Sequence, residues 1–333
     1  VGKTLPEIFG AASPKGNYAD MTTKGWEITL TWRDHFELAS KPFNYEIKGT
    51  LSDYISTIDR YNNENKYLDD YYEGMRVGEI WGYETEGLFK DQADIDNHAT
   101  QKLIKSSSKN IWYPGDVKLK DQDGNGAIDY GTNRVDDHGD LKVIGNSLPR
   151  FAYSINLSGD WNNFFISAFF QGVGKQDWYP SSECIFWGQY NRPYNNMPTW
   201  HQGNYWTEDN TDAYLPRYAG YNASLKSTPQ TRYLQNVAYI RLKNLQFGYT
   251  LPQPIVSKAK LQNVRVYISA ENLWCWSPLY KHTRDLDVTN IYGSDPDLTD
   301  ADMSSGLNGN RGSGDGNSYP QMKSVSLGLS VTF

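Results

Sequence analysis

The segment 323–333 alternates strictly between apolar and small polar side chains. One phase holds Val325, Leu327, Leu329, Val331 and Phe333, and the other holds Ser324, Ser326, Gly328, Ser330 and Thr332. A period of two predicts a β-strand with one apolar face and one polar face. A strand of this kind that closes on Phe is typical of the final strand of an outer-membrane β-barrel, and an ordinary sandwich strand is the alternative.

The same alternation recurs along the chain and predicts about seven antiparallel strands. Within 240–251 the phase slips between Lys243 and Asn244, which predicts a β-bulge. The other alternating segments are 26–33, 43–52, 151–158, 164–171 and 264–271.

The connections between these segments are of two kinds. Short turns are predicted around 39–42, 159–163 and 252–254, whereas the long loops are 57–150, 172–236 and 277–318. Such an asymmetry is typical of outer-membrane barrels, whose short turns face the periplasm and whose long loops face the outside of the cell. The pattern therefore favours an all-β, antiparallel transmembrane barrel segment with long extracellular loops.

The phase of each strand predicts which side chains share a face. In a barrel the polar phase, represented by Arg33, Lys48, Asn156 and Glu271, faces the lumen, and the apolar phase faces lipid. In a soluble sandwich the apolar faces would instead meet in a core. The residues that a barrel would expose are Trp26, Ile28, Leu30, Phe164, Ile166, Val266, Ile268, Leu327 and Leu329.

Composition narrows the possible functions. The 333 residues carry a net charge of −7 without a basic stripe, so no nucleic-acid partner is expected. No apolar run reaches the 18 or so residues of a transmembrane helix. This criterion does not apply to the strands of a barrel, in which only every second residue needs to be apolar. The 5 histidines form no H-x-x-x-H pair, so no enzyme chemistry is indicated. Cys184 and Cys275 could pair or stay free.

An acidic segment resembles the start of a calcium-binding loop. Side-chain oxygens stand at positions 1, 3, 5 and 9, a glycine at position 6, and a backbone carbonyl would serve at position 7. Position 12 is not Glu, so Asp136 or Asp137 could supply the missing carboxylate; a plain solvated turn is the alternative. The candidate ligands of a structural Ca²⁺ are Asp121, Asp123, Asn125, Ala127 and Asp129.

The loop 172–236 is rich in aromatic residues. Aromatic rings stack on sugars and also anchor protein interfaces, but a long loop needs aromatic residues for a small core of its own. Ligand contact, partner contact and core packing all remain open. The candidate ligand or partner residues are Trp178, Tyr179, Trp187, Tyr190, Trp200 and Trp206.

Short motifs follow one another in a fixed order along nearly the whole chain. They are Asn17-Tyr18-Ala19-Asp20 with Gly25-Trp26-Glu27, Gly82-Tyr83-Glu84-Thr85-Glu86-Gly87-Leu88-Phe89, Pro114-Gly115-Asp116, Val143-Ile144-Gly145-Asn146, Tyr239-Ile240-Arg241-Leu242-Lys243-Asn244 with Gly248-Tyr249-Thr250-Leu251-Pro252, Glu271-Asn272-Leu273 and Tyr319-Pro320. The ordered set resembles the C-terminal part of the SusC-like (SusC/RagA) TonB-dependent outer-membrane transporters.

The resemblance implies a barrel of about 22 strands with an N-terminal plug, energised by TonB and capped by a SusD-like surface lipoprotein. It implies import of glycan oligosaccharides or peptides across the outer membrane of a Gram-negative, Bacteroidota-type bacterium. Because only about seven strands and no plug or TonB box occur here, we expect residues 1–333 to be the C-terminal portion of such a barrel. The alternative is a soluble extracellular β-sandwich that binds glycans.

Overall fold

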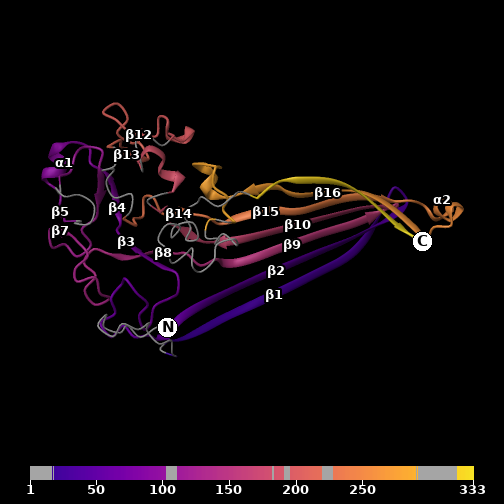
Figure 1. Cartoon of the computed structure of the whole chain (residues 1–333), viewed down its shortest axis with the longest axis horizontal. Helices are drawn as coiled ribbons and strands as arrows, with labels where there is room; N and C mark the ends of the chain where they lie inside the picture. Colours follow the sequence, from indigo (N-terminus) through magenta and orange to yellow (C-terminus); the bar gives the residue numbers. More distant parts are fainter. Residues whose placement is uncertain are drawn as a thin grey trace, which may run out of the picture.

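The computed structural model divides into a long seven-stranded sheet and a body of loops at one end of it (Figure 1). It describes residues 17, 19–102, 111–181, 184–190, 196–219, 228–289, 291 and 321–333. The motif residues Tyr18, Tyr319 and Pro320, and most of the loop 277–318, lie outside this range.

The seven predicted strands are all present, and β1, β2, β9, β10 and β16 are longer than their alternating segments. They form a single sheet in the order β1-β2-β9-β10-β15-β16-β17, in which every pair of neighbours is antiparallel. The strands are β1 (Asp20–Leu38), β2 (Lys41–Arg60), β9 (Arg150–Trp161), β10 (Phe164–Lys175), β15 (Tyr239–Thr250), β16 (Asn263–Trp276) and β17 (Ser324–Thr332).

Short connections lie at the end of the sheet that is remote from the loop body (Figure 1). Two of them turn on a pair of residues with positive φ, Ala39-Ser40 and Asn162-Asn163. Positive φ at both central positions is the geometry of a type I′ hairpin, which Asn favours. The third connection contains α2 (Gln253–Val256) and a 3₁₀ turn (Ser257–Ala259). The predicted asymmetry of short turns and long loops is confirmed.

The register places mainly polar side chains on one face of the sheet and mainly apolar side chains on the other, although Phe165 and Phe169 of β10 lie on the polar face. Two rows of cross-strand partners illustrate this, each with one residue from every strand. The apolar row is Trp32, Ile47, Leu157, Ala168, Leu245, Ala270 and Val325. The adjacent row, on the opposite face, is Arg33, Glu46, Ser158, Ser167, Gln246, Ser269 and Ser326.

The bulge predicted in 240–251 is confirmed, because the register of β15 shifts between Leu242 and Asn244 against both neighbours. This shift keeps Leu242 and Leu245 on the same face although their numbers differ in parity. Without it, the apolar face of β15 would change sides halfway along the strand.

The apolar face of the sheet is uncovered. All nine residues predicted to face outward are exposed, from 37% for Phe164 to 78% for Leu327. A soluble sandwich would bury these side chains against a second sheet, so the sandwich alternative is wrong. The four residues predicted for the other face do lie there, since Arg33 pairs with Glu46, Lys48 with Asn156, and Glu271 with Ser324.

The long loops predicted at 57–150 and 172–236 are not irregular throughout. They contain short elements, each of only a few residues, whose pattern is too brief to detect in a sequence. The pairs are β3 (Glu79–Gly82) with β8 (Lys142–Asn146), β4 (Thr85–Leu88) with β6 (Val117–Leu119), β5 (Thr100–Gln101) with β7 (Ala127–Ile128), β11 (Asp177–Trp178) with β14 (Gln235–Asn236), and β12 (Tyr205–Trp206) with β13 (Leu215–Arg217). The helical segments are α1 (Gln92–Asp96) and the 3₁₀ turns Ile185–Tyr190, Thr199–His201 and Pro278–Lys281.

The hydrophobic core of the protein lies in this loop body. Val117, Leu119 and Leu215 are completely buried there, and the rings of Trp187 and Tyr233, 5.2 Å apart, belong to the same cluster. Among the described residues, no helix is long and apolar enough to cross a membrane.

Candidate functional site

The acidic segment between β6 and β7 folds into a compact turn closed by its own side chains. Asp121 accepts hydrogen bonds from the backbone N–H groups of Gly124 (2.7 Å) and Gly126 (2.9 Å). Asn125 accepts from the N–H of Ala127 at 2.8 Å. Gly124 and Gly126 have φ of +74° and +83°, which other residues rarely adopt, so both glycines are needed for the bend.

A third carboxylate joins Asp121 and Asp123 from a distant position in the sequence. It belongs to Asp140, and ligand oxygens of the three residues all lie within 4.8 Å of one another. Asp140 is fully buried and accepts hydrogen bonds from the N–H groups of Gln122 (2.6 Å) and Asp129 (2.9 Å). The sequence interpretation missed this residue, because no spacing rule links it to the loop.

The other carboxylates predicted as ligands, Asp129, Asp136 and Asp137, do not belong to this group of three. Asp129 is not a member of the carboxylate group, and its side chain accepts from the N–H of Gly131 at 2.9 Å. Asp136 accepts from Arg134, and Asp137 accepts from the N–H of Thr132. Asp140 therefore stands in the position that Asp136 or Asp137 was expected to fill.

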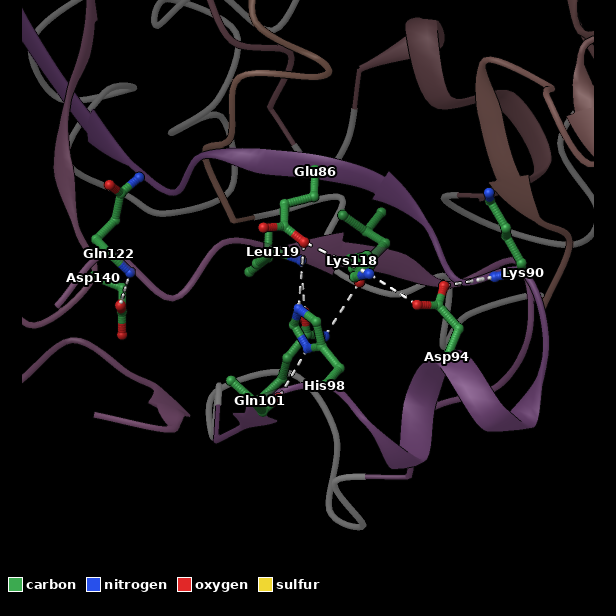
Figure 2. Close-up of polar contacts among 11 residues, drawn as sticks. Glu86, Lys90, Asp94, His98, Gln101, Lys118, Leu119, Gln122 and Asp140 are labelled. Carbon is green, nitrogen blue, oxygen red and sulfur yellow. Dashed lines mark hydrogen bonds and ion pairs between the residues drawn. The ribbon is translucent and has the colours of Figure 1, made fainter. Parts of the chain in front are cut away.

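A network of polar contacts holds β6, the strand that leads into the acidic turn (Figure 2). The buried Gln101 donates to the carbonyl of Val117 (3.2 Å) and accepts from the N–H of Leu119 (2.7 Å). Between these two residues, Lys118 donates to Asp94 at 2.8 Å. Because the strand is fixed on both sides, the position of the turn relative to Asp140 is fixed as well.

The charges of the cluster favour a cation. Burial raises the pKa of Asp140, and repulsion from the nearby carboxylates of Asp123 and Asp121 raises it further. A hard divalent cation would relieve both effects, and calcium prefers oxygen ligands. Binding of Ca²⁺ by this loop stays a prediction, with Asp121, Asp123 and Asp140 as the side chains that the structure brings together.

Three of the six aromatic residues proposed to meet a ligand or partner are core residues. Trp178, Trp187 and Tyr190 are at most 2% exposed. Trp187 donates its indole N–H to the carbonyl of Pro180 (3.2 Å), and Tyr190 donates its hydroxyl to that of Pro216 (2.6 Å). A ring that is enclosed on both faces cannot stack on a sugar, so these three residues stabilise the loop body.

The remaining three lie at the margin of the same core. The hydroxyl of Tyr179 donates to the carbonyl of Thr228 at 2.8 Å, and burial raises the pKa of this phenol. The ring of Trp200 lies 5.0 Å from that of Phe186. The buried indole N–H of Trp206 has no hydrogen-bond partner among the described residues. Contact of Tyr179, Trp200 or Trp206 with a ligand stays a prediction.

The two cysteines do not pair. Cys184 is buried in the loop core, whereas Cys275 is half-buried on the polar face of the sheet, and neither forms a disulfide. The question that the sequence left open is thereby answered, and no disulfide joins the sheet to the loop body.

Comparison with known proteins gives a consistent result. No family model matches the chain. It is 27% identical to TonB-dependent receptor P3 of Formosa agariphila over 99% of its own length and 30% of the relative. It is 25% identical to TonB-dependent receptor P26 of the same organism, over 99% of the chain and 31% of the relative. The chain thus spans about 30% of the length of the curated relatives that it matches.

Solved structures show the same fold. A structure of the RagAB peptide transporter superposes with a TM-score of 0.60 at 18% identity, over 99% of this chain and 31% of that one. The RagAB peptide importer in its "open-open" state gives a TM-score of 0.61 at 17% identity, over 100% and 31%. These findings confirm the resemblance to the TonB-dependent transporters, and the fold of the sheet is that of an antiparallel β-barrel segment.

Proposed function

We propose that this chain is the C-terminal part of a TonB-dependent transporter that imports nutrients across the outer membrane. The observation that supports this most directly is the separation of the two faces of the sheet. Every strand contributes an apolar residue to one row and a polar residue to the next, and Trp32, Ile47, Leu157 and Val325 of the apolar row are exposed. Such a surface is stable only in contact with lipid.

The edges of the sheet support assembly into a larger barrel. Within the described residues, β1 pairs only with β2, and β17 pairs only with β16. An unpaired strand edge is not tolerated in lipid, because its N–H and C=O groups have no partners there. The edges of β1 and β17 would therefore pair with strands of the remaining barrel, which would enclose the plug and reach TonB through it.

The loop body would stand on the outer side of the membrane. It lies at the end of the sheet opposite the short turns, which face the periplasm in outer-membrane barrels. A SusD-like surface lipoprotein would cap it, with Tyr179, Trp200 and Trp206 as candidate contacts. The cargo would be a glycan oligosaccharide or a peptide, and the solved RagAB complexes are described as peptide transporters.

We also propose a structural role for calcium in this body. A cation held by Asp121, Asp123 and Asp140 would join the turn between β6 and β7 to the start of β8. It would order the loops without taking part in any reaction.

A growth and uptake experiment tests the transport function. Deletion of the gene should abolish growth on the oligomeric nutrient but not on its monomer, and an uncoupler of the proton-motive force should stop uptake of the labelled oligomer. Uptake that survives the uncoupler, or recovery of the protein from the soluble fraction of fractionated cells, would contradict the proposal.

A further inference from the structure

We propose that a cavity on the polar face of the sheet binds an anionic group of the cargo. The group is a carboxylate or sulfate with a hydroxyl or amide N–H donor beside it. This inference rests on the proposed transport function and specifies the chemistry of the cargo.

The cavity lies at the loop end of β15 and β16, on the face that would line the lumen. Two of its lining residues, Arg241 and Cys275, pair with each other on the polar face. The same row continues across the sheet through Gln171, the partner of Arg241, to Ser154. The volume of the cavity is about 240 Å³. A water molecule occupies about 30 Å³ in the liquid, so the cavity has room for one sugar or amino-acid residue of a larger ligand.

The lining is mainly cationic. Arg241, Arg284 and Lys323 contribute positive charges. Among the described lining residues the only negative charge is that of Asp287, which forms an ion pair with Arg241. Two cationic side chains thus remain without a matching carboxylate in the lining, which favours an anionic ligand.

Two of the lining residues each have a buried polar atom that lacks a partner among the described residues. Arg241 is 3% exposed, and although its two terminal nitrogens donate to Asp287 and to Gln321, its Nε–H donates to nothing. The side-chain oxygen of Asn272 is also buried without a donor. Unpaired buried groups are costly, so each indicates a missing partner.

These two atoms specify what the missing partner offers. The Nε–H of Arg241 needs an acceptor, and guanidinium groups match carboxylates and sulfates well. The oxygen of Asn272 needs a donor. An acidic sugar supplies both through its carboxylate or sulfate and a ring hydroxyl, and a peptide supplies both through its terminal carboxylate and the adjacent amide.

The rim of the cavity holds its exposed cation in place. Arg284 lies over the ring of Tyr280, 5.2 Å from its centre, and the hydroxyl of Tyr280 donates to the sulfur of Cys275 at 3.6 Å. A ligand that contacts Arg284 in this cavity would therefore shield Cys275. The rate at which this thiol is alkylated reports on occupancy without any need for transport.

The test measures alkylation of Cys275 by N-ethylmaleimide in the purified full-length protein, with peptide mass spectrometry as the readout. Cys184, which is 1% exposed, is the internal reference for intact folding. Each charged probe has a neutral counterpart: trigalacturonic acid against galactotriose, and trialanine against trialanine amide. The variant is Arg284→Gln, and the control is Lys281→Gln, an exposed cation of the same loop that does not line the cavity.

We expect at least one charged probe to slow the alkylation of Cys275 while its neutral counterpart does not. Arg284→Gln should raise the concentration for half-protection about tenfold, the effect of one lost charge-assisted hydrogen bond, and Lys281→Gln should leave it unchanged. The charged probe that protects identifies the cargo as an acidic glycan or a peptide.

Three results would overturn the inference: no protection by either charged probe, equal protection by a neutral counterpart, or equal effects of the two variants. Normal uptake without protection would overturn this site alone. Protection without energy-dependent uptake would instead contradict the transport function.

Discussion

The sheet and the loop body place the same kinds of side chain in opposite surroundings. In the sheet, Leu30 and Leu327 are 71% and 78% exposed, whereas in the loop body Leu215 is completely buried and Trp187 is 1% exposed. The loop body follows the usual rule of water-soluble domains, with apolar residues inside. The sheet inverts it on one face. The difference shows that the two regions of one chain are built for two solvents.

Each region should therefore respond to a different kind of substitution. A lost core side chain should damage the loop body, and a charge on the apolar face should damage the sheet. The following changes separate the two regions, beginning with the largest expected effect.

Trp187→Ala should destabilise the loop body by about 3–5 kcal/mol, the usual effect of deleting a buried large aromatic side chain. Trp187 packs edge-on against Phe186 and Tyr233 within the core. Limited proteolysis should then cut the loops while the barrel stays folded. The matched control is Trp32→Ala on the exposed face of β1, which should leave protease resistance of the loops unchanged. Equal loop cleavage in both variants would contradict the division into two regions.

Ile166→Arg should destabilise the membrane-inserted protein by about 2–4 kcal/mol, because it places a charge on the lipid face of the sheet. Ser167→Arg places the same charge one residue further along β10, on the polar face, and should have little effect. Urea titration of the protein in lipid vesicles measures both. Similar losses from the two substitutions would show that the faces do not meet different solvents.

Stability of the loop body should fall as the pH falls from about 6.5 to about 4. Burial lowers the pKa of His201 to about 4. Its Nε2 lies 2.9 Å from the carbonyl oxygen of Phe186, and its Nδ1 has no partner among the described residues. The unfolded state binds a proton below about pH 6.5 and the folded state does not, so up to roughly 3 kcal/mol is lost across this window.

Urea unfolding of the loops at several pH values measures this loss. The variant His201→Gln should reduce the dependence in this window, and the part that remains would come from His282, whose pKa is also lowered by burial. The stability of the sheet should not change with the variant. A wild-type protein whose loops are equally stable at pH 7 and pH 4 would contradict the role of His201.

Asp140→Asn should have the smallest effect on the stability of the loop body when no metal is present. The effect should be larger when Ca²⁺ is present. If the three carboxylates hold Ca²⁺, a chelator should speed proteolysis of the turn between β6 and β7 in the wild-type protein but not in the variant. Asp136→Asn, in the same loop but outside the carboxylate group, is the control. Equal cleavage with and without chelator in the wild-type protein would favour the plain turn.

The sheet was predictable from the sequence because its signal is local. A period of two identifies each strand, and the slip between Lys243 and Asn244 identifies the bulge without any knowledge of neighbours. The ends of the strands were predicted less accurately. β1 and β2 continue well beyond their alternating segments, since main-chain pairing persists from Asp20–Arg60 to Leu38–Lys41.

The loop body was less predictable because its order depends on contacts between distant segments. Asp140 joins Asp121 and Asp123 only because β8 starts beside the turn, which no local pattern reveals. The aromatic segment left three interpretations open, since Trp187 would have the same sequence context as a core residue or as a ligand contact. The cavity beside Arg241 has no sequence signature, because Arg284 and Lys323 approach it from separate segments.

The central claim is that the apolar face of the sheet meets lipid and the polar face meets water. Spin labels placed singly at residues 29–33 of β1, in a background without the two native cysteines, test it in the full-length protein in bilayers. Accessibility to oxygen, which partitions into lipid, should peak at Leu30 and Trp32, and accessibility to a water-soluble nickel complex should peak at Thr29, Thr31 and Arg33. Low accessibility to both reagents at residues 30 and 32 would place these side chains in a protein core and contradict the account.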